Sequence, residues 1–414
     1  MLFFRSALWP GLVVAVRTIV TITINKLVAV YYGPAGITLL AHFQNLVSFF
    51  LSIQSDGVNV GVVRFLSSNE EDTVQKNAYF NAGLILNVLF FLIPCLFLFL
   101  FSNLLLTLFD YSVNSKTWLF LFLAGIFLQM LSLYFISVIL AEKKLKLYAL
   151  VNIISSISSL VLSYLAAKNY SLTMVLLVIA IAPSVSILVT IYYLLTKAQV
   201  HYKLQLVTQA APYKELLKFS AMAISILVFG RLTDFLVRQY AIQHFALYET
   251  GLWQSAVKLS DSYTGAFIAI IGAVYFPKIA ELQSSPQELR TYVRKVVFAL
   301  AALLAVGFIL LAVLKEQVLL LLYQKEFAEA AAFVNYQLIA DFFRLIAFLL
   351  GYLIIARAKT GLFIVLEAAS AIVYIFFIFL LINLLGIESM QVANIIRYFL
   401  YLITLIIINR KYLL

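Results

Sequence analysis

Long apolar stretches, each about the length of a membrane-crossing helix, recur along the whole of this 414-residue chain. About 20 consecutive apolar residues are enough to cross a hydrocarbon core of about 30 Å. Short segments with charged residues, proline or glycine separate the stretches. The pattern predicts an all-α polytopic membrane protein whose twelve transmembrane helices lie at residues 7–30, 36–63, 80–107, 117–140, 147–167, 173–195, 217–241, 249–275, 292–314, 329–356, 361–384 and 389–409.

The longest polar stretch inside the chain, residues 197–216, separates the first six spans from the last six. We therefore predict an N-terminal six-helix lobe over residues 1–196, a cytoplasmic linker over residues 197–216 and a C-terminal six-helix lobe over residues 217–414. Proline interrupts two of the spans, at Pro94 and Pro183, where we expect the helices to kink.

The two halves show traces of an internal duplication. A shift of 215 residues places residues 139–147 on residues 354–362, and Gly36 on Gly251, at equivalent places in the predicted topology. Because each half has an even number of spans, both halves enter the membrane from the same side, and the repeats are parallel. We expect two parallel lobes around a central cavity.

The second span carries a row of polar residues in an otherwise apolar segment. With about 100° of rotation per residue, these positions fall within roughly 100° of one helical face. A transmembrane helix with one polar face lines water, a cavity or a polar partner, which indicates transport of something polar. The row consists of Asn45, Ser48, Ser52, Ser55, Asp56 and Asn59.

The charges fix the predicted orientation. The chain is 64% hydrophobic and 11% charged, and its net charge is +11. With both termini in the cytoplasm, most of its 29 lysines and arginines fall in cytoplasmic segments. This bias is the positive-inside pattern, and it explains the net charge by contact with anionic membrane lipid, without nucleic acid. The outer loops contain only Lys116, Lys168, Lys315 and Lys325.

Cofactor and metal chemistry have no support in the sequence. Cys95 is the single cysteine, and it lies within a span. The chain contains neither a P-loop nor an H-E-x-x-H motif, so we predict no cofactor, no metal site and no ATP hydrolysis by this chain.

Charged residues inside the spans require a reason, because each costs at least about 2.5 kcal/mol at mid-helix. Arg17 lies about 15 Å into the first span, close to the midplane, and its own helix offers no acid. We expect Arg17 to meet an anion from a ligand or from another helix, with Asp56 as its resting partner. Other charges have a three- or four-residue spacing that favours pairing along one helix: Arg231 with Asp234 and Arg238, Lys258 with Asp261, and Asp341 with Arg344.

Three segments resemble Wzx-type flippases of the multidrug/oligosaccharidyl-lipid/polysaccharide exporter superfamily, above all the enterobacterial common antigen type. Residues 251–282 are similar to the helix 8 region of that family, residues 336–359 to its helix 10 region, and residues 26–36 to the end of its first helix. With twelve spans in two halves, the similarity covers essentially the whole chain.

The resemblance implies a flippase that moves undecaprenyl-diphosphate-linked oligosaccharide units, of O-antigen or common-antigen type, by alternating access. Movement would run from the cytoplasmic to the periplasmic leaflet of the bacterial inner membrane. Arg17 and Lys26 match paired basic positions of the family's cationic cavity. Where relatives have Asn-Phe-Arg-Gln, this chain has His42-Phe43-Gln44-Asn45, so that phosphate contact is lost or passes to His42. A polysaccharide polymerase and a chain-length regulator are the implied protein partners.

Together, the residue pattern and the resemblance define one predicted site. Asp56, Asp261 and Glu367 are also candidates for a coupling ion site. The predicted substrate-binding residues are Arg17, Lys26, His42, Asn45, Ser48, Ser52, Asp56, Asn59, Arg231, Gln254, Lys258 and Asp261.

Three other functions are less consistent with the sequence than a flippase. A cation-coupled drug or metabolite exporter of the same superfamily would use Asp56 or Asp261 as a proton or Na⁺ site, but the spans hold more cations than acids. A polysaccharide polymerase or ligase needs a large periplasmic loop, and the longest outer loop covers only residues 315–329. A purely structural membrane subunit is the third. We therefore predict a transporter and not an enzyme.

Overall fold

The computed structural model describes residues 2–68, 72–108, 115–196, 202–207, 209–282, 285–357 and 359–413. Within these residues the chain is helical throughout its regular structure and contains no strand. Nine of the described helical stretches are long and apolar enough to cross a membrane. The all-α membrane class is thus confirmed, whereas the number of twelve crossings stays a prediction. Two of the nine stretches, Trp9–Ser67 and Gly361–Ile408, are long enough to contain two crossings each.

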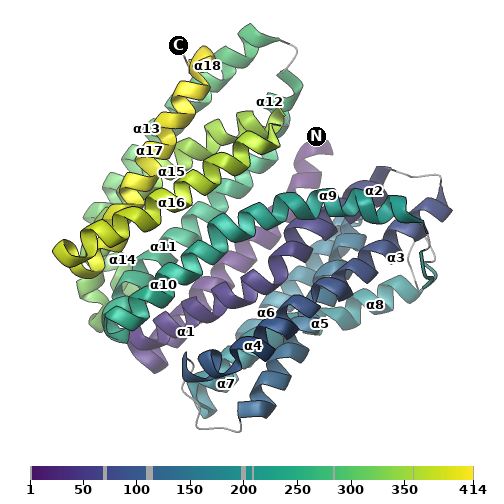
Figure 1. The fold of residues 1–414 in the computed structure, drawn as a ribbon, viewed down its shortest axis with the longest axis horizontal. Helices are drawn as coiled ribbons and strands as arrows, with labels where there is room; N and C mark the ends of the chain where they lie inside the picture. Colours follow the sequence, from purple (N-terminus) through teal and green to yellow (C-terminus); the bar gives the residue numbers. More distant parts are fainter. Residues whose placement is uncertain are drawn as a thin grey trace. The chain divides into compact units, whose positions relative to one another are not determined.

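The chain forms two compact units, which we describe separately. Unit 1 comprises Met1–Tyr31 and His42–Arg231, and unit 2 comprises Tyr32–Ala41 and Leu232–Leu414. The lobe boundaries predicted from the linker differ from these limits and stay a prediction. The elements up to the unit boundary are α1 (Leu2–Ile53), η1 (Gln54–Val58), α2 (Asn59–Ser68), α3 (Thr73–Phe90), α4 (Leu92–Leu108), α5 (Ser115–Ala141), α6 (Leu145–Asn169), α7 (Leu172–Ile181), η2 (Ala182–Val185), α8 (Ser186–Thr196), α9 (Ala210–Ile226) and η3 (Leu227–Leu232) (Figure 1).

In unit 2, α15, α16 and α17 pack together side by side, and α11 and α13 also pack against α15 (Figure 1). Buried residues from η4, α12, α13, α15, α16, α17 and α18 form its apolar core, and partly buried residues of α11 pack against it. The elements of this part of the chain are α10 (Thr233–His244), α11 (Leu247–Ile270), η4 (Ile271–Tyr275), α12 (Phe276–Glu281), α13 (Pro286–Val313), α14 (Lys315–Leu322), η6 (Lys325–Ala330), α15 (Ala331–Ala356), α16 (Thr360–Leu385), η7 (Gly386–Glu388), α17 (Ser389–Ile408) and α18 (Arg410–Leu413).

The two predicted proline kinks are confirmed. The helix carrying Pro94 is interrupted at Phe91, between α3 and α4, and Pro183 lies in the 3₁₀ turn η2 between α7 and α8. Proline lacks the N–H that an α-helix needs, and its ring meets the carbonyl of the preceding turn, so both interruptions have a local cause.

Gly33 ends the first span of α1. Its φ of 62° and ψ of −162° lie outside the helical range, and this positive φ favours glycine over every other residue. Pro34 follows, and its missing N–H suits the start of the next helical segment.

The segment Tyr32–Ala41 belongs to unit 2 because specific contacts tie it there. Thr38 donates its hydroxyl to the carbonyl of Leu247 over 2.8 Å, and buried Arg238 donates through Nη1 to the carbonyl of Ala41 over 3.0 Å. Gly251 in α11 lies directly against the backbone of Pro34.

Replacing Gly251 with alanine should therefore destabilise unit 2 by about 3 kcal/mol, as overpacking of a tight contact does. The added Cβ would overlap the carbonyl group of Pro34 and lie 2.9 Å from its Cα, and backbone atoms yield less easily than a side chain. The matched control is Gly265→Ala on the same helix, where no atom lies within 4 Å of the added Cβ. Thermal unfolding of both purified variants in detergent measures the effect. Equal melting temperatures for the two would show that the Gly251 contact relaxes freely.

Glycines also bring α9 close to the second half of the first long helix in unit 1. A Cβ on Gly57 would lie 2.8 Å from the Cα of Ser220, and one on Gly61 would lie 2.8 Å from a methyl carbon of Leu216. The absence of side chains at these two positions lets the helices approach along η1 and α2. This close packing explains why α9 belongs to unit 1, although the sequence assigned it to the C-terminal lobe.

Residues 202–207 of the predicted linker have no regular secondary structure and are held by α3. Asn77 accepts the N–H of Lys203 through Oδ1 over 2.8 Å. Asn81 donates through Nδ2 to the carbonyl of Lys203 over 2.8 Å and accepts the N–H of Gln205 over 3.0 Å.

Burial and the carboxylate of Glu142 raise the pKa of Tyr202 well above its usual range. Helix α9 begins at Ala210, within the predicted linker 197–216, whose bounds stay a prediction.

Candidate functional site

The first half of α1 presents basic side chains outward from unit 1. Arg17 and Lys26 are both exposed, whereas Asn25, which precedes Lys26 in sequence, is 3% exposed. Among the described residues, no ion pair joins Arg17 to an acid, and Arg17 lies close enough to Tyr148 of α6 to interact with it electrostatically. An arginine that lies within a membrane span and outside the packed protein requires a polar or water-filled environment.

Asp56 pairs with Arg231, so the predicted pairing of Asp56 with Arg17 is wrong. Arg231 Nη2 lies 2.9 Å from Asp56 Oδ2, and both side chains are about one-third exposed, at 36% and 35%. Ser55 also donates its hydroxyl to Asp56 Oδ1 over 3.1 Å. The pair is formed because α9 packs along η1, and η3, which carries Arg231, directly continues α9. Spacing within one helix does not reveal this proximity.

Both members of this pair lie in π-helical segments. Asp56 lies in η1 and Arg231 in η3. A π-helical segment inserts an extra residue into an α-helix and changes which residues share a face, and such segments occur frequently at functional sites. The Asp56–Arg231 pair is therefore a candidate functional element on structural grounds as well as on charge.

The π-helical segment also disperses the predicted polar row. Asn45 and Ser48 are half-buried, but Ser52 is 1% exposed and donates its hydroxyl to the carbonyl of Phe49. Asn59 is 4% exposed and accepts from Asn87 over 3.1 Å within unit 1. His42 is completely buried. The row therefore does not form one exposed face: Ser52 is buried before η1 begins, and η1 interrupts the period of 3.6 before Asn59.

In unit 2, the predicted polar face of α11 is exposed only at one end. Gln254 is fully buried, Lys258 is half-buried, and Asp261 is exposed. Asp261 lies close enough to Lys258 to attract it electrostatically, which is the interaction that their three-residue spacing favours.

The predicted ladder along α10 is also wrong. Arg231 turns to Asp56, and Arg238 donates to the carbonyl of Ala41. Asp234 is exposed and acts on Arg238 only at longer range. A backbone carbonyl thus replaces the expected acid as the neighbour of a buried guanidinium.

A second carboxylate, Asp341 on α15, is the centre of a buried polar cluster in unit 2. Ser260 and Tyr263 of α11 donate to its Oδ2 over 2.6 and 2.5 Å, and Gln337 donates to its Oδ1 over 3.1 Å. Arg344 Nη1 lies 3.7 Å from Oδ1, so the predicted Asp341–Arg344 pair is confirmed. Asp341 is itself 0% exposed.

The sequence analysis missed the extent of this cluster. One face of α15 carries Gln337, Asp341 and Arg344, because they are spaced by four and three residues. This spacing could have predicted that Gln337 joins the Asp341–Arg344 pair. The contribution of α11 depends on the packing of α11 against α15, which no local pattern reports.

Glu367, the third candidate for ion coupling, lies on α16. It is half-buried, and its Oε1 accepts the hydroxyl of Tyr401 over 2.7 Å. One turn away, Ser370 accepts the Nε–H of buried Arg397 over 2.8 Å. Among the described residues, no group of three or more His, Cys, Asp and Glu side chains is arranged to hold a metal ion.

The comparison with known families identifies the chain. The sequence profile of a family described as "Polysaccharide biosynthesis protein" matches residues 39–332. The chain belongs to this family. The family assignment agrees with the resemblance to Wzx-type flippases, which it confirms.

Individual relatives of this polysaccharide biosynthesis protein cover nearly its full length. It is 22% identical over 418 aligned positions to the Lipid III flippase of Escherichia coli K12. This alignment covers 95% of this chain and 96% of the relative. Its structure is similar to the inward-facing conformation of a multidrug resistance MATE family transporter of the MOP superfamily, with a TM-score of 0.72, 12% identity and coverage of 97% and 94%. A MOP superfamily transporter from Pyrococcus furiosus gives a TM-score of 0.70, 14% identity and coverage of 99% and 95%. These structures establish that the chain has the fold of MOP transporters.

Proposed function

We propose that this protein is a flippase for undecaprenyl-diphosphate-linked oligosaccharide units, working by alternating access. The observation that carries the proposal is the exposure of Arg17 and Lys26 within a membrane span of a polysaccharide biosynthesis protein. The full-length similarity to a Lipid III flippase supports the same substrate class. The site of action would be the bacterial inner membrane, with both termini in the cytoplasm.

The chemistry of such a substrate matches these side chains. A diphosphate has several anionic oxygens, and a guanidinium can donate two parallel N–H···O bonds to them. At membrane depth the low dielectric strengthens that attraction compared with water. The protein therefore provides a polar surface for a headgroup that hydrocarbon excludes.

Within this proposal the Asp56–Arg231 pair has a definite role. The pair is accessible to an entering ligand, because about one-third of each side chain is exposed. A diphosphate competes with Asp56 for Arg231, and the released carboxylate can then accept sugar hydroxyls. Asn45 and Ser48, which are half-buried, supply further polar groups nearby in sequence.

Energy for net movement can come from the membrane potential. An inside-negative potential favours outward movement of negative charge by about 2.3 kcal/mol per charge per 100 mV. Exposed Asp261 is the better candidate for an exchanging cation than Asp56, because Arg231 neutralises Asp56 at 2.9 Å.

Reconstitution into proteoliposomes tests the proposal. We expect the protein to move a fluorescent undecaprenyl-diphosphate-linked saccharide between leaflets, and to leave a fluorescent phosphatidylcholine in place. An empty-liposome control sets the background. The proposal fails if the saccharide lipid moves no faster than in empty liposomes, or if both lipids move equally. Movement of a cationic drug in place of the saccharide lipid would favour the exporter alternative.

A further inference from the structure

Two turns, one in each unit, have nearly the same backbone geometry and carry basic residues. The first basic turn, with Lys144 and Lys146, joins α5 to α6, and the second, with Arg357 and Lys359, joins α15 to α16. The 215-residue shift places Lys144 on Lys359. Lys144 has a φ of −83° and a ψ of 62°, and Lys359 has a φ of −83° and a ψ of 59°. Each of these two lysines also donates its backbone N–H to the carbonyl of the isoleucine five residues earlier, over 3.3 and 3.2 Å.

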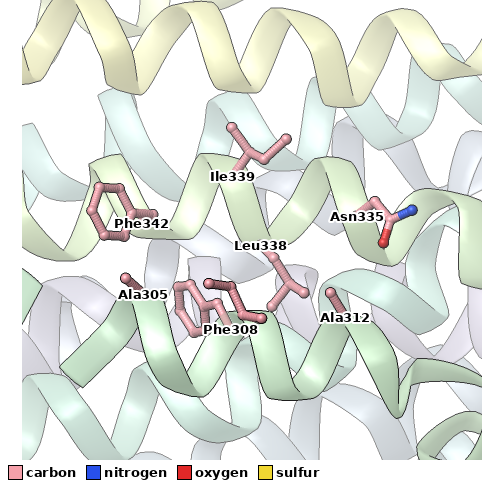
Figure 2. A pocket seen from close by; sticks show the side chains of 8 residues that line it. Ala305, Phe308, Ala312, Asn335, Leu338, Ile339 and Phe342 are labelled. Atoms are coloured by element: carbon pink, nitrogen blue, oxygen red, sulfur yellow. The ribbon is translucent and has the colours of Figure 1, made fainter. Parts of the chain in front are cut away.

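Both basic turns lie at the ends of apolar stretches that are long enough to cross a membrane. The first connects the stretches Lys116–Ala141 and Leu145–Asn169, and the second connects Lys325–Ala356 and Gly361–Ile408. Between such ends the surface is apolar: Figure 2 shows the pocket between α13 and α15, where Asn335 is the one polar residue of the lining. The cations of the two turns therefore lie at the level of lipid headgroups and not of hydrocarbon.

An aromatic ring from the first or the last helix of the chain holds a cation at each turn. In unit 1, Nζ of Lys146 lies 5.9 Å from the centroid of the Trp9 ring in α1. In unit 2, Cζ of Arg357 lies 4.2 Å from the centroid of the Tyr412 ring in α18, and Nζ of Lys411 lies 5.0 Å from the same centroid. A ring attracts a cation through its quadrupole, so it fixes the position of the cation without neutralising the charge.

The acids of the described residues do not neutralise these turns. Glu142, in the first turn, accepts the hydroxyl of Tyr193 through Oε2 over 2.8 Å. In the second turn, Nε and Nη2 of Arg357 are buried and have no hydrogen-bond partner among the described residues. Cations held close together without an acid repel one another, and a bound anion removes that repulsion. The side chains that form no ion pair with a described acid are Lys144, Lys146, Arg357 and Lys359.

An exposed apolar residue follows each basic turn at the same position. Leu150 on α6 is 50% exposed and Val365 on α16 is 63% exposed, and the 215-residue shift places one on the other. An anion that binds a turn therefore has an apolar surface beside it, within the membrane. A phospholipid provides both parts, with a phosphate for the cations and acyl chains for the exposed apolar side chains, whereas a soluble anion provides only the first.

We propose that each basic turn binds the headgroup phosphate of an anionic phospholipid, one at unit 1 and one at unit 2. Phosphatidylglycerol is the occupant that we test, because its phosphodiester has one negative charge and its headgroup has no cation to repel the turn. The inference concerns lipid that stays in the bilayer, so it does not depend on which substrate is transported. The bound lipids anchor the same point of the repeat in each unit to the membrane surface.

Native mass spectrometry counts the bound lipids. The full-length protein is released from micelles that contain equal amounts of phosphatidylglycerol and phosphatidylcholine. We expect the unchanged protein to retain two molecules of phosphatidylglycerol. Lys144→Gln/Lys146→Gln and Arg357→Gln/Lys359→Gln should each retain one, because the loss of two cations weakens binding at that turn by about 30-fold. The variant with all four substitutions should retain none.

The matched control removes two lysines from the opposite ends of the same helices. Lys116 lies near the start of α5 and Lys168 near the end of α6, and both are exposed. Lys116→Gln/Lys168→Gln should therefore still retain two molecules of phosphatidylglycerol. Loss of lipid from this control to the same extent as from the turn variants, or retention of as much phosphatidylcholine as phosphatidylglycerol, would overturn the inference.

Thermal unfolding gives a second readout that corrects for any change in folding. Each variant is compared with itself, in micelles with phosphatidylcholine alone and in micelles with added phosphatidylglycerol. A ligand that binds only the folded state raises the melting temperature, so we expect the rise to be smaller in each turn variant and absent in the fourfold variant. An equal rise in all variants contradicts binding at the turns.

Competition identifies the source of the phosphate. Inorganic phosphate or a short-chain polyprenyl diphosphate is added at the concentration of phosphatidylglycerol, and the retained lipids are counted again. We expect both molecules of phosphatidylglycerol to remain. Their displacement by inorganic phosphate would identify a site for a free anion, and their displacement by the diphosphate would assign the turns to a transported lipid. Either result overturns the assignment to bilayer phospholipid.

Discussion

Replacing Arg17 with glutamate should reduce transport of the saccharide lipid by on the order of 100-fold, or about 2.7 kcal/mol. The reversed charge repels the diphosphate at membrane depth, where screening by water is weak. Arg17→Lys keeps the charge but loses the planar two-bond geometry, so we expect a reduction of roughly tenfold. Complementation of a flippase-null strain, scored by surface glycan, and flipping in proteoliposomes provide the measurements.

Expression provides the control for Arg17. The side chain is exposed and forms no ion pair with a described acid, so removing it leaves no buried charge uncompensated. All Arg17 variants should therefore accumulate normally in the membrane. Full complementation by Arg17→Glu at normal expression would show that Arg17 does not meet the phosphates, and Lys26 would become the leading cation of α1.

The fold class was predictable from sequence because membrane solvation acts on each helix separately. A backbone in hydrocarbon must satisfy its own hydrogen bonds, so each apolar run of sufficient length becomes a helix. Glycine and proline at Gly33, Pro94 and Pro183 break helices by local sterics, which is also readable in a sequence.

The partners of charged residues were less predictable. Spacing along one helix identified Asp341 with Arg344 correctly, but it gave wrong partners for Arg231 and Arg238. Those two pair with groups that are distant in sequence, and the contact depends on helix packing. The π-helical segment η1 adds a second difficulty, because one inserted residue moves Asn59 away from the face that a constant period predicts.

The roles of the site residues remain predictions for the same reason. Sequence reasoning chose Gln254 from its position on a polar helical face, and the structure buries it completely. It did not choose Tyr263 or Ser260, whose value lies in their distances to Asp341 on another helix. A pattern along one helix identifies which residues share a polar face. It does not show which side chains of two different helices come within hydrogen-bonding distance of each other.

Replacing Asp341 with alanine should be the most destabilising single charge deletion in unit 2, by about 3 kcal/mol. The carboxylate is fully buried and accepts from Ser260, Tyr263 and Gln337. Its removal leaves those donors without their acceptor and leaves Arg344 without its ion-pair partner. We expect a lower melting temperature in detergent and less protein in the membrane.

Two comparisons distinguish loss of this cluster from loss of any acid. Asp261→Ala removes an exposed carboxylate from α11 and should change the free energy of unfolding by no more than about 0.5 kcal/mol. In the double variant Asp341→Ala/Arg344→Ala, the stranded cation is gone, so its destabilisation should be smaller than the sum of the two single effects. Additive losses would show that Asp341 and Arg344 act independently despite their 3.7 Å separation, and that hydrogen bonds from α11 alone hold the carboxylate.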